Sequence, residues 1–440
     1  MAVVNLGCPK NVVDGERMAG LLVRAGFRAT NDPRRAEAVI VNTCGFIEDA
    51  KRESIEAILQ AGELKRKACR VLVVGGCLAQ RYCSDLSGEM PEVDAFIGVS
   101  EIGRIAEVVR DALEGNGSRE RRYVAKPEAS LAFLPRRLST PVHTAYLKIG
   151  DGCDNRCAYC TIPQIRGRMR SAPMEDLIAE SKDLAKQGAK ELTLVSQDSA
   201  RYGEDLYGRN RITELLQGLS EISGITWLRL LYLHPAHVAE TLLETVADSP
   251  KVCKYVDLPI QHISDRILSA MNRKVTGKEI RTLIKNIRTR ISGAALRTTL
   301  IVGLPGETEK EFEELLEFVE ETRFDRLGVF RYSREAGTKA ARMLGQVEDD
   351  VKSERLERLM ETQRQISQSL LKKKIGRKLK VIVDSVSPKG NAIGRSEAEA
   401  LDIDGVIHLQ GAAKRGDFVS ARIQSSDDHD LYGETVRPEG

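Results

Sequence analysis

The stretch AYLKIGDGCDNRCAYC, residues 145–160, decides the fold of the central part of this chain. An apolar run typical of a β-strand ends at Gly150, and three cysteines follow at once in the pattern C-x3-C-x2-C: Cys153, Cys157 and Cys160. A loop at the carboxyl end of a strand is where an α/β barrel gathers its reactive side chains. Structural zinc sites use four ligands, usually from C-x2-C pairs, and no second pair lies nearby. Three thiolates on one short loop instead indicate a 4Fe-4S cluster with one iron left open to a ligand.

The segments that follow this loop alternate between short apolar runs and helical patterns. Strands are expected at 145–150, 191–196, 227–233, 254–260, 296–304 and 326–333, and a long helix at 347–374. Six strands that alternate with helices predict a partial (β/α)6 barrel, two units short of a complete one.

The first third of the chain shows the same alternation with a second set of cysteines. Apolar runs at 2–8, 38–44 and 70–77 are separated by helical patterns at about 14–26 and 48–64, which predicts an open parallel α/β sheet. Each run ends in a cysteine: Cys8, Cys44 and Cys77. Neighbouring strands lie about 4.8 Å apart, so three strand-end thiols can meet around one small cluster.

Each of these three cysteines taken alone is better explained by packing, and only the set favours ligands. Cys83 could replace Cys77 if the register differs. We interpret Cys69, Cys83 and Cys253 as structural, because they do not share the strand-end position.

The last part of the chain loses its helical patterns. Short strands at 378–386, 406–409 and 417–424 with glycine-rich connections predict a small all-β barrel of the OB type. The predicted domains are 1–117, a linker over 118–138, 139–372 and 373–440.

Composition narrows the class of protein. Of the 440 residues, 42% are hydrophobic and 30% charged, which is typical of a globular protein. The formal net charge of +3 gives no overall basic surface for nucleic acid. The first residues do not read as a signal peptide, and no run approaches the roughly 20 apolar residues of a membrane span, so we expect a cytoplasmic protein without membrane contact. Nine cysteines in such a chain favour metal or redox chemistry over disulfides.

The whole chain resembles the methylthiotransferase family of radical S-adenosylmethionine enzymes, whose domains are an N-terminal methylthiotransferase domain, a radical S-adenosylmethionine barrel and a C-terminal TRAM domain. GCPKN at the first cysteine and NTCGFI at the second are similar to the RimO branch, which modifies an aspartate of ribosomal protein S-twelve; the tRNA-modifying branch typically reads GCQMN. The matching stretches are LGCPKN (6–11), VNTCGFI (41–47), GGCLAQR (75–81), AYLKIGDGCDNRCAYC (145–160), IPQIRG (162–167), VSQD (195–198), LPIQH (258–262), TTLIVGLPGET (298–308), FRYSREAGT (330–338), NAIGRSEAEA (391–400) and DLYG (430–433).

The resemblance implies two 4Fe-4S clusters and S-adenosylmethionine as cofactors. Cys153, Cys157 and Cys160 would hold the cluster that makes a 5'-deoxyadenosyl radical, which takes a hydrogen from the β-carbon of the target aspartate. The cluster on Cys8, Cys44 and Cys77 would supply the sulfur, and a second S-adenosylmethionine the methyl group. The residues expected to contact S-adenosylmethionine are Tyr159, Gln197, Asp198, Thr299, Ile301 and Gly303.

Ordinary structural roles remain open for several of these residues. Gln197 and Asp198 could only cap the next helix, and Ile301 could be core. His262 is a polar contact or a structural histidine. The basic residues Arg166, Arg168 and Arg170 either hold an acidic group or form a solvated loop.

The expected partners are ribosomal protein S-twelve or the small ribosomal subunit, and a reducing electron donor; we expect a monomer. Residues 376–440 carry nine Lys and Arg against eleven Asp and Glu, a net charge of −2, which suits a basic ribosomal protein better than RNA. Three alternatives stay open: a tRNA adenosine as substrate of the same chemistry, a non-catalytic iron–sulfur electron carrier, and a zinc-stabilised RNA-binding protein.

Overall fold

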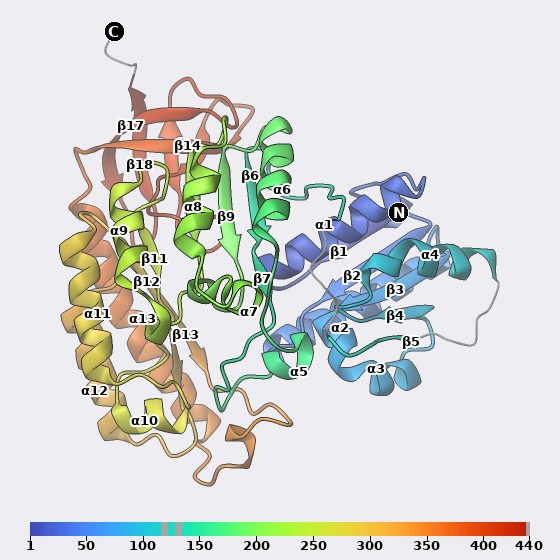
Figure 1. The fold of residues 1–440 in the computed structure, drawn as a ribbon, viewed down its shortest axis with the longest axis horizontal. Helices are drawn as coiled ribbons and strands as arrows, with labels where there is room; N and C mark the ends of the chain where they lie inside the picture. Colours follow the sequence, from blue (N-terminus) through green and yellow to red (C-terminus); the bar gives the residue numbers. More distant parts are fainter. Residues whose placement is uncertain (116–121, 128–133, 437–440) are drawn as a thin grey trace.

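The computed structural model describes residues 1–115, 122–127 and 134–436 (Figure 1). The N-terminal part is a parallel sheet of order β1-β2-β3-β4-β5. Its strands are β1 (Ala2–Asn5), β2 (Ala38–Thr43), β3 (Val71–Gly76), β4 (Ala95–Ile97) and β5 (Arg122–Tyr123), and its helices are α1 (Pro9–Arg24), α2 (Glu48–Glu63), α3 (Cys77–Glu89) and α4 (Ile105–Glu114).

Helices cover both faces of this sheet because its central strands are apolar on both sides. Val39 and Val41 of β2 pack in one cluster with residues of α2 and α3, whereas Ile40 packs in the other with residues of α1 and α4. This is the alternation of side chains along a strand. The parallel order leaves the carboxyl ends of β1, β2 and β3 side by side at one edge.

The central part is the predicted partial barrel. Two parallel three-stranded sheets, of order β10-β9-β6 and β11-β12-β13, meet at a bridge between Leu228 and Val252. Its strands are β6 (Thr144–Lys148), β9 (Glu191–Val195), β10 (Trp227–Leu230), β11 (Tyr255–Asp257), β12 (Ala295–Val302) and β13 (Arg326–Arg331), with a small β7 (Gly150–Asp151) and β8 (Arg170–Ser171) pair at one end. Its helices are α5 (Ile162–Arg166), α6 (Met174–Lys186), α7 (Glu204–Tyr207), α8 (Ile212–Ser220), α9 (Glu240–Asp248), α10 (Asp265–Ala270), α11 (Gly277–Arg290), α12 (Glu309–Thr322) and α13 (Asp349–Lys372).

The C-terminal part is a closed barrel of order β14-β15-β16-β18-β17, which confirms the predicted all-β barrel. Its strands are β14 (Lys378–Val386), β15 (Ala392–Arg395), β16 (Ile407–Gln410), β17 (Phe418–Ser426) and β18 (Leu431–Val436). The sequence patterns alone missed β15 and β18, because both are short and each contains a glycine. Gly394 lies so close to β14 that a Cβ there would be 2.3 Å from the Ile382 carbonyl oxygen.

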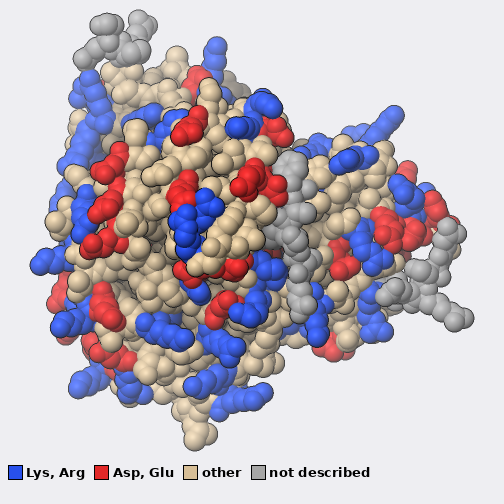
Figure 2. Space-filling view, in the orientation of Figure 1, with Lys and Arg blue, Asp and Glu red and all other residues tan. Residues whose placement is uncertain are grey.

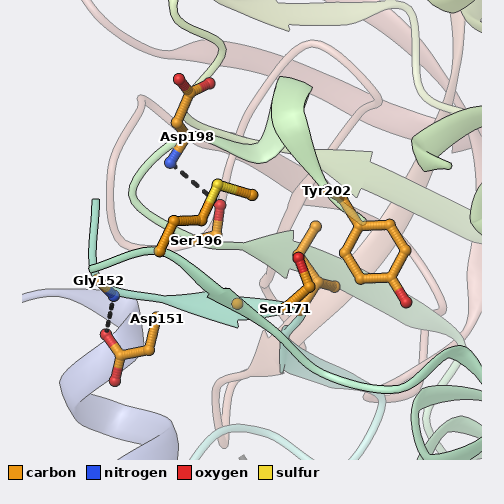
Figure 3. A pocket seen from close by; sticks show the side chains of 9 residues that line it. Asp151, Gly152, Ser171, Ser196, Asp198 and Tyr202 are labelled. Atoms are coloured by element: carbon orange, nitrogen blue, oxygen red, sulfur yellow. Dashed lines mark hydrogen bonds between the residues drawn. The ribbon is translucent and has the colours of Figure 1, made fainter. Parts of the chain in front are cut away.

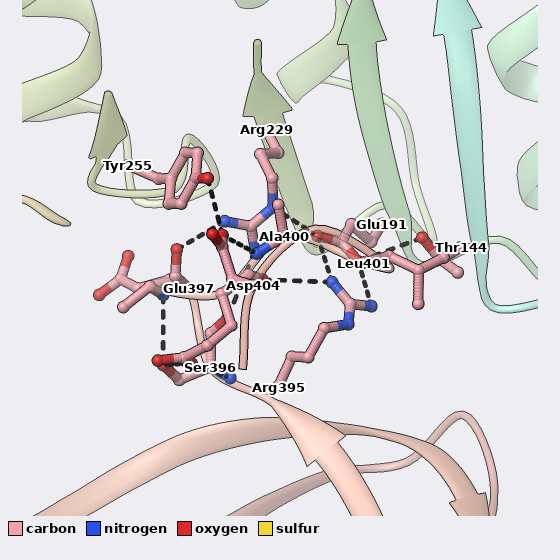
Figure 4. A network of polar contacts seen from close by, with 12 residues as sticks. Thr144, Glu191, Arg229, Tyr255, Arg395, Ser396, Glu397, Ala400, Leu401 and Asp404 are labelled. Atoms are coloured by element: carbon pink, nitrogen blue, oxygen red, sulfur yellow. Dashed lines mark hydrogen bonds and ion pairs between the residues drawn. The ribbon is translucent and has the colours of Figure 1, made fainter. Parts of the chain in front are cut away.

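The C-terminal barrel docks on the amino ends of the central strands, and the segment between β15 and β16 enters the central barrel. Ala400 of this segment packs in one cluster with Tyr146 and Tyr255. Figure 4 shows the buried ion pairs around it: Glu191, the first residue of β9, binds Arg229 of β10 and Arg395 of β15 at 2.9 and 2.7 Å. The opposite, carboxyl end of the strands is left for the cysteine loop.

Several elements differ from the prediction at their ends. The strand expected over 227–233 ends at Leu230, because Tyr232 has a φ of 63° and its backbone N–H donates to Asp257. The strand expected over 254–260 is only Tyr255–Asp257. Helix α1 begins at Pro9, directly after Cys8 and earlier than expected.

The predicted linker over 118–138 contains β5, and its residues 118–121 and 128–133 lie outside the described residues. The boundaries 1–117, 139–372 and 373–440 stay predictions. Of the helices in the part of the chain that the structure describes, none is long and apolar enough to cross a bilayer.

Candidate active site with two cysteine groups

The loop with Cys153, Cys157 and Cys160 follows β6 and β7 and is held at several points by backbone hydrogen bonds. The N–H of Cys153 donates to Gly167, and the N–H of Cys160 donates to the Cys157 carbonyl, both at 3.1 Å. Gly152 enters the loop with a φ of 72°, and a Cβ there would lie 2.0 Å from the Arg168 carbonyl oxygen. The loop therefore needs glycine at this position.

Two side chains from other segments hold this loop. Arg273 is 5% exposed and its guanidinium lies 3.7 Å from the Cys157 sulfur. Asn155 donates to Asp198 at 2.8 Å, and Asp198 also lies 2.7 Å from His237 Nδ1. Asp198 thus ties the cysteine loop to the segments after β9 and β10.

The second group, Cys8, Cys44 and Cys77, lies at the carboxyl ends of β1, β2 and β3. Cys8 is the N-cap residue of α1 and Cys77 is the first residue of α3, so two of the thiols lie at helix N-termini, where the dipole favours a thiolate. A Cβ at Gly7 would lie 2.7 Å from Cys44 Cβ and 3.1 Å from its sulfur. The glycine leaves room for the cysteines to approach.

Burial and neighbouring charges shift the pKa values of the thiols in both groups. Burial, and then the charges of Cys77 and Cys8, raise the pKa of Cys44 to about 12. Burial would also raise the pKa of Cys8, but Lys10 and Arg166 lower it below its ordinary value. Burial raises the pKa of Cys153 to about 11. Iron binding must release the protons of such thiols.

The spacing of the sulfurs favours a cluster over a single ion. In the described part of the chain, neither cysteine group brings three ligand atoms within 4.8 Å of one another; only Asp198, His234 and His237 do so. A tetrahedral zinc at about 2.3 Å from each sulfur would need closer thiolates. A 4Fe-4S cluster takes one thiolate per iron, which suits wider triads. The zinc alternative is therefore disfavoured, and the two donor sets fit clusters.

Arg166, at the end of α5, joins the two groups. It is 1% exposed, and its guanidinium donates to the Cys77 sulfur at 3.3 Å, to Asp14 at 2.9 Å and to Asp151 at 2.8 Å. Lys148 binds the same two carboxylates at 2.7 and 2.6 Å. Arg166 is thus a buried bridge and no part of a solvated loop.

The residues expected to contact S-adenosylmethionine lie at the carboxyl ends of the strands. Gln197 donates to Asp151 at 2.9 Å, and its buried Oε1 has no hydrogen-bond partner. Asp198 does not cap the next helix, because its side chain makes no hydrogen bond to the helix N-terminus. A pocket with room for about one water (about 10 Å³) lies between Asp151 and Asp198 (Figure 3).

Three more of these residues come from β12 and the turn after it. Thr299 and Ile301 are partly exposed and alternate with buried neighbours, so they share one face of the strand. Ile301 and Tyr159 pack together against one small apolar cluster. Gly303 donates to Glu307 at 2.9 Å and has a φ of 76°. Their contact with a cofactor stays a prediction.

The other residues that the sequence singled out take ordinary positions. His262 is fully buried, its Nδ1 accepts from Ser264, and burial lowers its pKa to about 3. Arg168 is exposed, whereas Arg170 donates to the Pro127 carbonyl oxygen. The remaining cysteines are buried, in agreement with packing roles: Cys69, Cys83 and Cys253.

Sequence reasoning did not single out several residues of the site. Lys10 and Asn11 follow Cys8 with only Pro9 between them, and two polar residues so close to a predicted ligand were a usable signal. Arg273 and His237 gave no signal, because only the fold brings them to the cysteine loop.

Three segments of the chain match known protein families, and the whole chain is similar to known proteins. Residues 1–98 match the uncharacterized protein family UPF0004, residues 147–319 the radical SAM superfamily and residues 375–436 the TRAM domain. A relative from Desulforamulus reducens named "Ribosomal protein uS12 methylthiotransferase RimO" is 47% identical over 99% of both chains. One of the same name from Geobacter sulfurreducens is 46% identical over 99% of this chain and 98% of its own.

The chain belongs to the RimO family. Like that family, it is a radical S-adenosylmethionine methylthiotransferase, and its cofactors are S-adenosylmethionine and two 4Fe-4S clusters. The fold is also similar to that of TsrM from Kitasatospora setae, a radical S-adenosylmethionine methyltransferase, with a TM-score of 0.59 at 16% identity over 77% of this chain and 76% of that one. The RimO family assignment confirms the predicted family and fold class.

Proposed function

We propose that this enzyme adds a methylthio group to the β-carbon of an aspartate of ribosomal protein S-twelve. The observation that carries this proposal is the identity of 46–48% over nearly the whole chain with relatives named "Ribosomal protein uS12 methylthiotransferase RimO". The mixed charge of one face of the molecule gives further support. Basic and acidic side chains are interspersed on the face in Figure 2, with no broad basic area for RNA.

The two cysteine groups divide the cofactors between them. Cys153, Cys157 and Cys160 would hold the cluster that works with S-adenosylmethionine, and Cys8, Cys44 and Cys77 would hold the other. When bound, these groups supply one-electron chemistry able to break an unactivated C–H bond, together with the sulfur and the methyl group of the product.

The protein itself supplies orientation and shielding from water. The unpaired Oε1 of Gln197 is an acceptor for the ammonium group of S-adenosylmethionine. Asp198 fixes the cysteine loop through Asn155. Arg166 holds the two cysteine groups at a constant separation, as a reaction between two centres requires.

The setting of the reaction is also part of the proposal. We expect a cytoplasmic monomer that takes electrons from a reducing donor and acts on S-twelve or on the small ribosomal subunit.

The test compares cells with and without this gene by intact mass of the small-subunit ribosomal proteins and by analysis of tRNA nucleosides. We expect S-twelve to lose the mass of one methylthio group while the tRNA nucleosides stay unchanged. Loss of a methylthio adenosine from tRNA with unchanged S-twelve would instead establish the tRNA alternative. Reductive cleavage of S-adenosylmethionine, lost in Cys157→Ala, separates this enzyme from an electron carrier.

A further inference from the structure

Lys10 is a buried cation at the contact between the N-terminal sheet and the central barrel. It is 7% exposed, two residues after Cys8, on the first turn of α1. Its ammonium donates to the Ser196 carbonyl oxygen at 3.1 Å and lies 3.7 Å from the centre of the Tyr232 ring. In the part of the chain that the structure describes, no carboxylate forms an ion pair with it, and two of its three N–H donors have no acceptor.

The carboxylates nearest to Lys10 already serve other cations. Asp14 and Asp151 are each bound by both Lys148 and Arg166. Three buried cations thus share these two carboxylates, and the other anion beside Lys10 is the thiolate of Cys8, a cluster ligand. Within the described residues Lys10 therefore has no carboxylate of its own, and a carboxylate that a substrate brings would complete its hydrogen bonds.

The position of Lys10 indicates which anion. Its side chain leaves the N-terminal sheet and reaches the central barrel, where Ser196 follows β9 and Tyr232 follows β10. It therefore lies between the sheet edge that carries Cys8 and the carboxyl ends of β9 and β10. The ligand sulfur Cys77 takes its hydrogen bond from Arg166, so the Lys10 ammonium remains available for another ligand.

We propose that Lys10 binds the side-chain carboxylate of the target aspartate of ribosomal protein S-twelve. This inference rests on the proposed function. In aspartate the reacting β-carbon is bonded directly to the carboxylate carbon, so an ion pair to the carboxylate fixes the position of the β-carbon between the two cysteine groups. Lys10 is then a substrate-binding residue that selects an acidic side chain.

The test is a double-mutant cycle on binding. Reconstituted full-length enzyme, wild type or Lys10→Met, is titrated anaerobically with recombinant S-twelve that carries either the target aspartate or asparagine in its place. For the wild type we expect the asparagine protein to bind roughly 10- to 100-fold more weakly, the effect of losing one charged hydrogen-bonded pair. For Lys10→Met we expect both S-twelve proteins to bind equally weakly.

Controls separate this role from a structural one. Lys10→Arg keeps the charge and should restore a preference for aspartate, whereas Lys186→Met removes an exposed lysine and should keep the wild-type preference. Iron content is measured for every variant; should Lys10→Met lose iron, the cycle is repeated with Lys10→Gln, which removes the charge and keeps a hydrogen-bond donor, and loss or retention of the aspartate preference decides.

The proposal is overturned if the wild type binds both S-twelve proteins equally, or if Lys10→Met keeps the full preference for aspartate. It is also overturned if Lys10→Met weakens binding of S-adenosylmethionine while the aspartate preference is kept. Failure of the wild type to bind S-twelve, both as the free protein and within the small ribosomal subunit, would instead overturn the proposed function.

Discussion

Arg166 is the residue through which the two cysteine groups are connected, and its three kinds of partner explain its burial. A guanidinium has five N–H donors in a fixed plane, so one arginine can bind two carboxylates, an amide oxygen and a sulfur at once. Asn11, its amide partner at 2.9 Å, also donates to the carbonyl oxygens of Leu6 and Thr43 beside the cysteines. A lysine could replace the charge of Arg166 but not this geometry.

We expect Arg166→Gln to change the N-terminal cluster more than the one on the barrel. Loss of a hydrogen bond to the Cys77 sulfur alters the reduction potential of a cluster held there, whereas Cys157 keeps its own arginine, Arg273. The measurement is a redox titration followed by electron paramagnetic resonance, with Arg168→Gln, an exposed arginine two residues away, as control. Unchanged potentials for both clusters would contradict this role.

Two buried histidines give the protein a stability that depends on pH. Burial lowers the pKa of His262 to about 3 and that of His234 to about 2. Both are neutral in the folded protein, whereas the unfolded chain takes up their protons below about pH 6.5. The free energy of unfolding is therefore highest above that pH, and it falls as the pH drops toward these values.

We expect His262→Asn to reduce this slope between pH 6.5 and 5, by up to about 1.4 kcal/mol per pH unit. Urea unfolding of cluster-free protein measures it, because the clusters themselves are absent from both the wild type and the variant. A slope equal to that of the wild type would show that His262 is not buried in its neutral form.

At the scale of the element, each cysteine loop depends on a glycine that ends or follows a strand. We expect Gly152→Ala to lower the iron content of the barrel site and the reductive cleavage of S-adenosylmethionine, because its Cβ would meet the Arg168 carbonyl oxygen. The matched control is Gly188→Ala, which also has positive φ, at 108°, but open space around it. It should cost only the backbone strain, about 1 kcal/mol, without loss of iron. Equal iron loss in both variants would mean that strain, and not the close approach, matters.

The elements also show how far the sequence could lead. The strands that lead to Cys8, Cys44 and Cys77 could be predicted, because each is an apolar run followed by glycine. The loop at Cys153 could be predicted as well. The pairing of Arg166 with Cys77 was not, since these residues are 89 positions apart and no local pattern records the contact. The same holds for Lys10 and Ser196, which are 186 positions apart. The sequence patterns did not predict β15 and β18, because such short strands show little alternation of apolar and polar residues.

In the whole molecule, the N-terminal sheet and the C-terminal barrel lie at opposite ends of the central barrel. The N-terminal sheet meets the carboxyl ends of the strands, where Glu335 binds Lys51 and Arg81. The C-terminal barrel meets the amino ends and fills the interior with the segment around Ala400. The chemistry is thus enclosed from one side by the second cysteine group and from the other by this segment.

We expect Arg395→Met to lower the free energy of unfolding of the whole molecule, because it leaves the buried carboxylate of Glu191 and the half-buried one of Asp384 with fewer partners. Breaking such a pair costs about 3–5 kcal/mol. The control is Arg364→Met. Arg364 lies on α13 and forms an ion pair with Asp428 of the C-terminal barrel, so it too links the two parts, but it is exposed. Its loss should lower the free energy of unfolding by less than about 1 kcal/mol. Denaturant unfolding measures both variants.

The same network predicts a second signature in acid. Burial raises the pKa of Glu191, but Arg395 and Arg229 outweigh it and hold the pKa at about 2. Since the folded value is below the ordinary one, the pairs stabilise the protein above about pH 4.5, and this contribution is lost as the pH falls toward 2. In Arg395→Met one of the two cations is gone, so the loss should begin at higher pH than in the wild type. If the two acid transitions coincide, Arg229 alone balances Glu191, and the docking of the C-terminal barrel does not depend on Arg395.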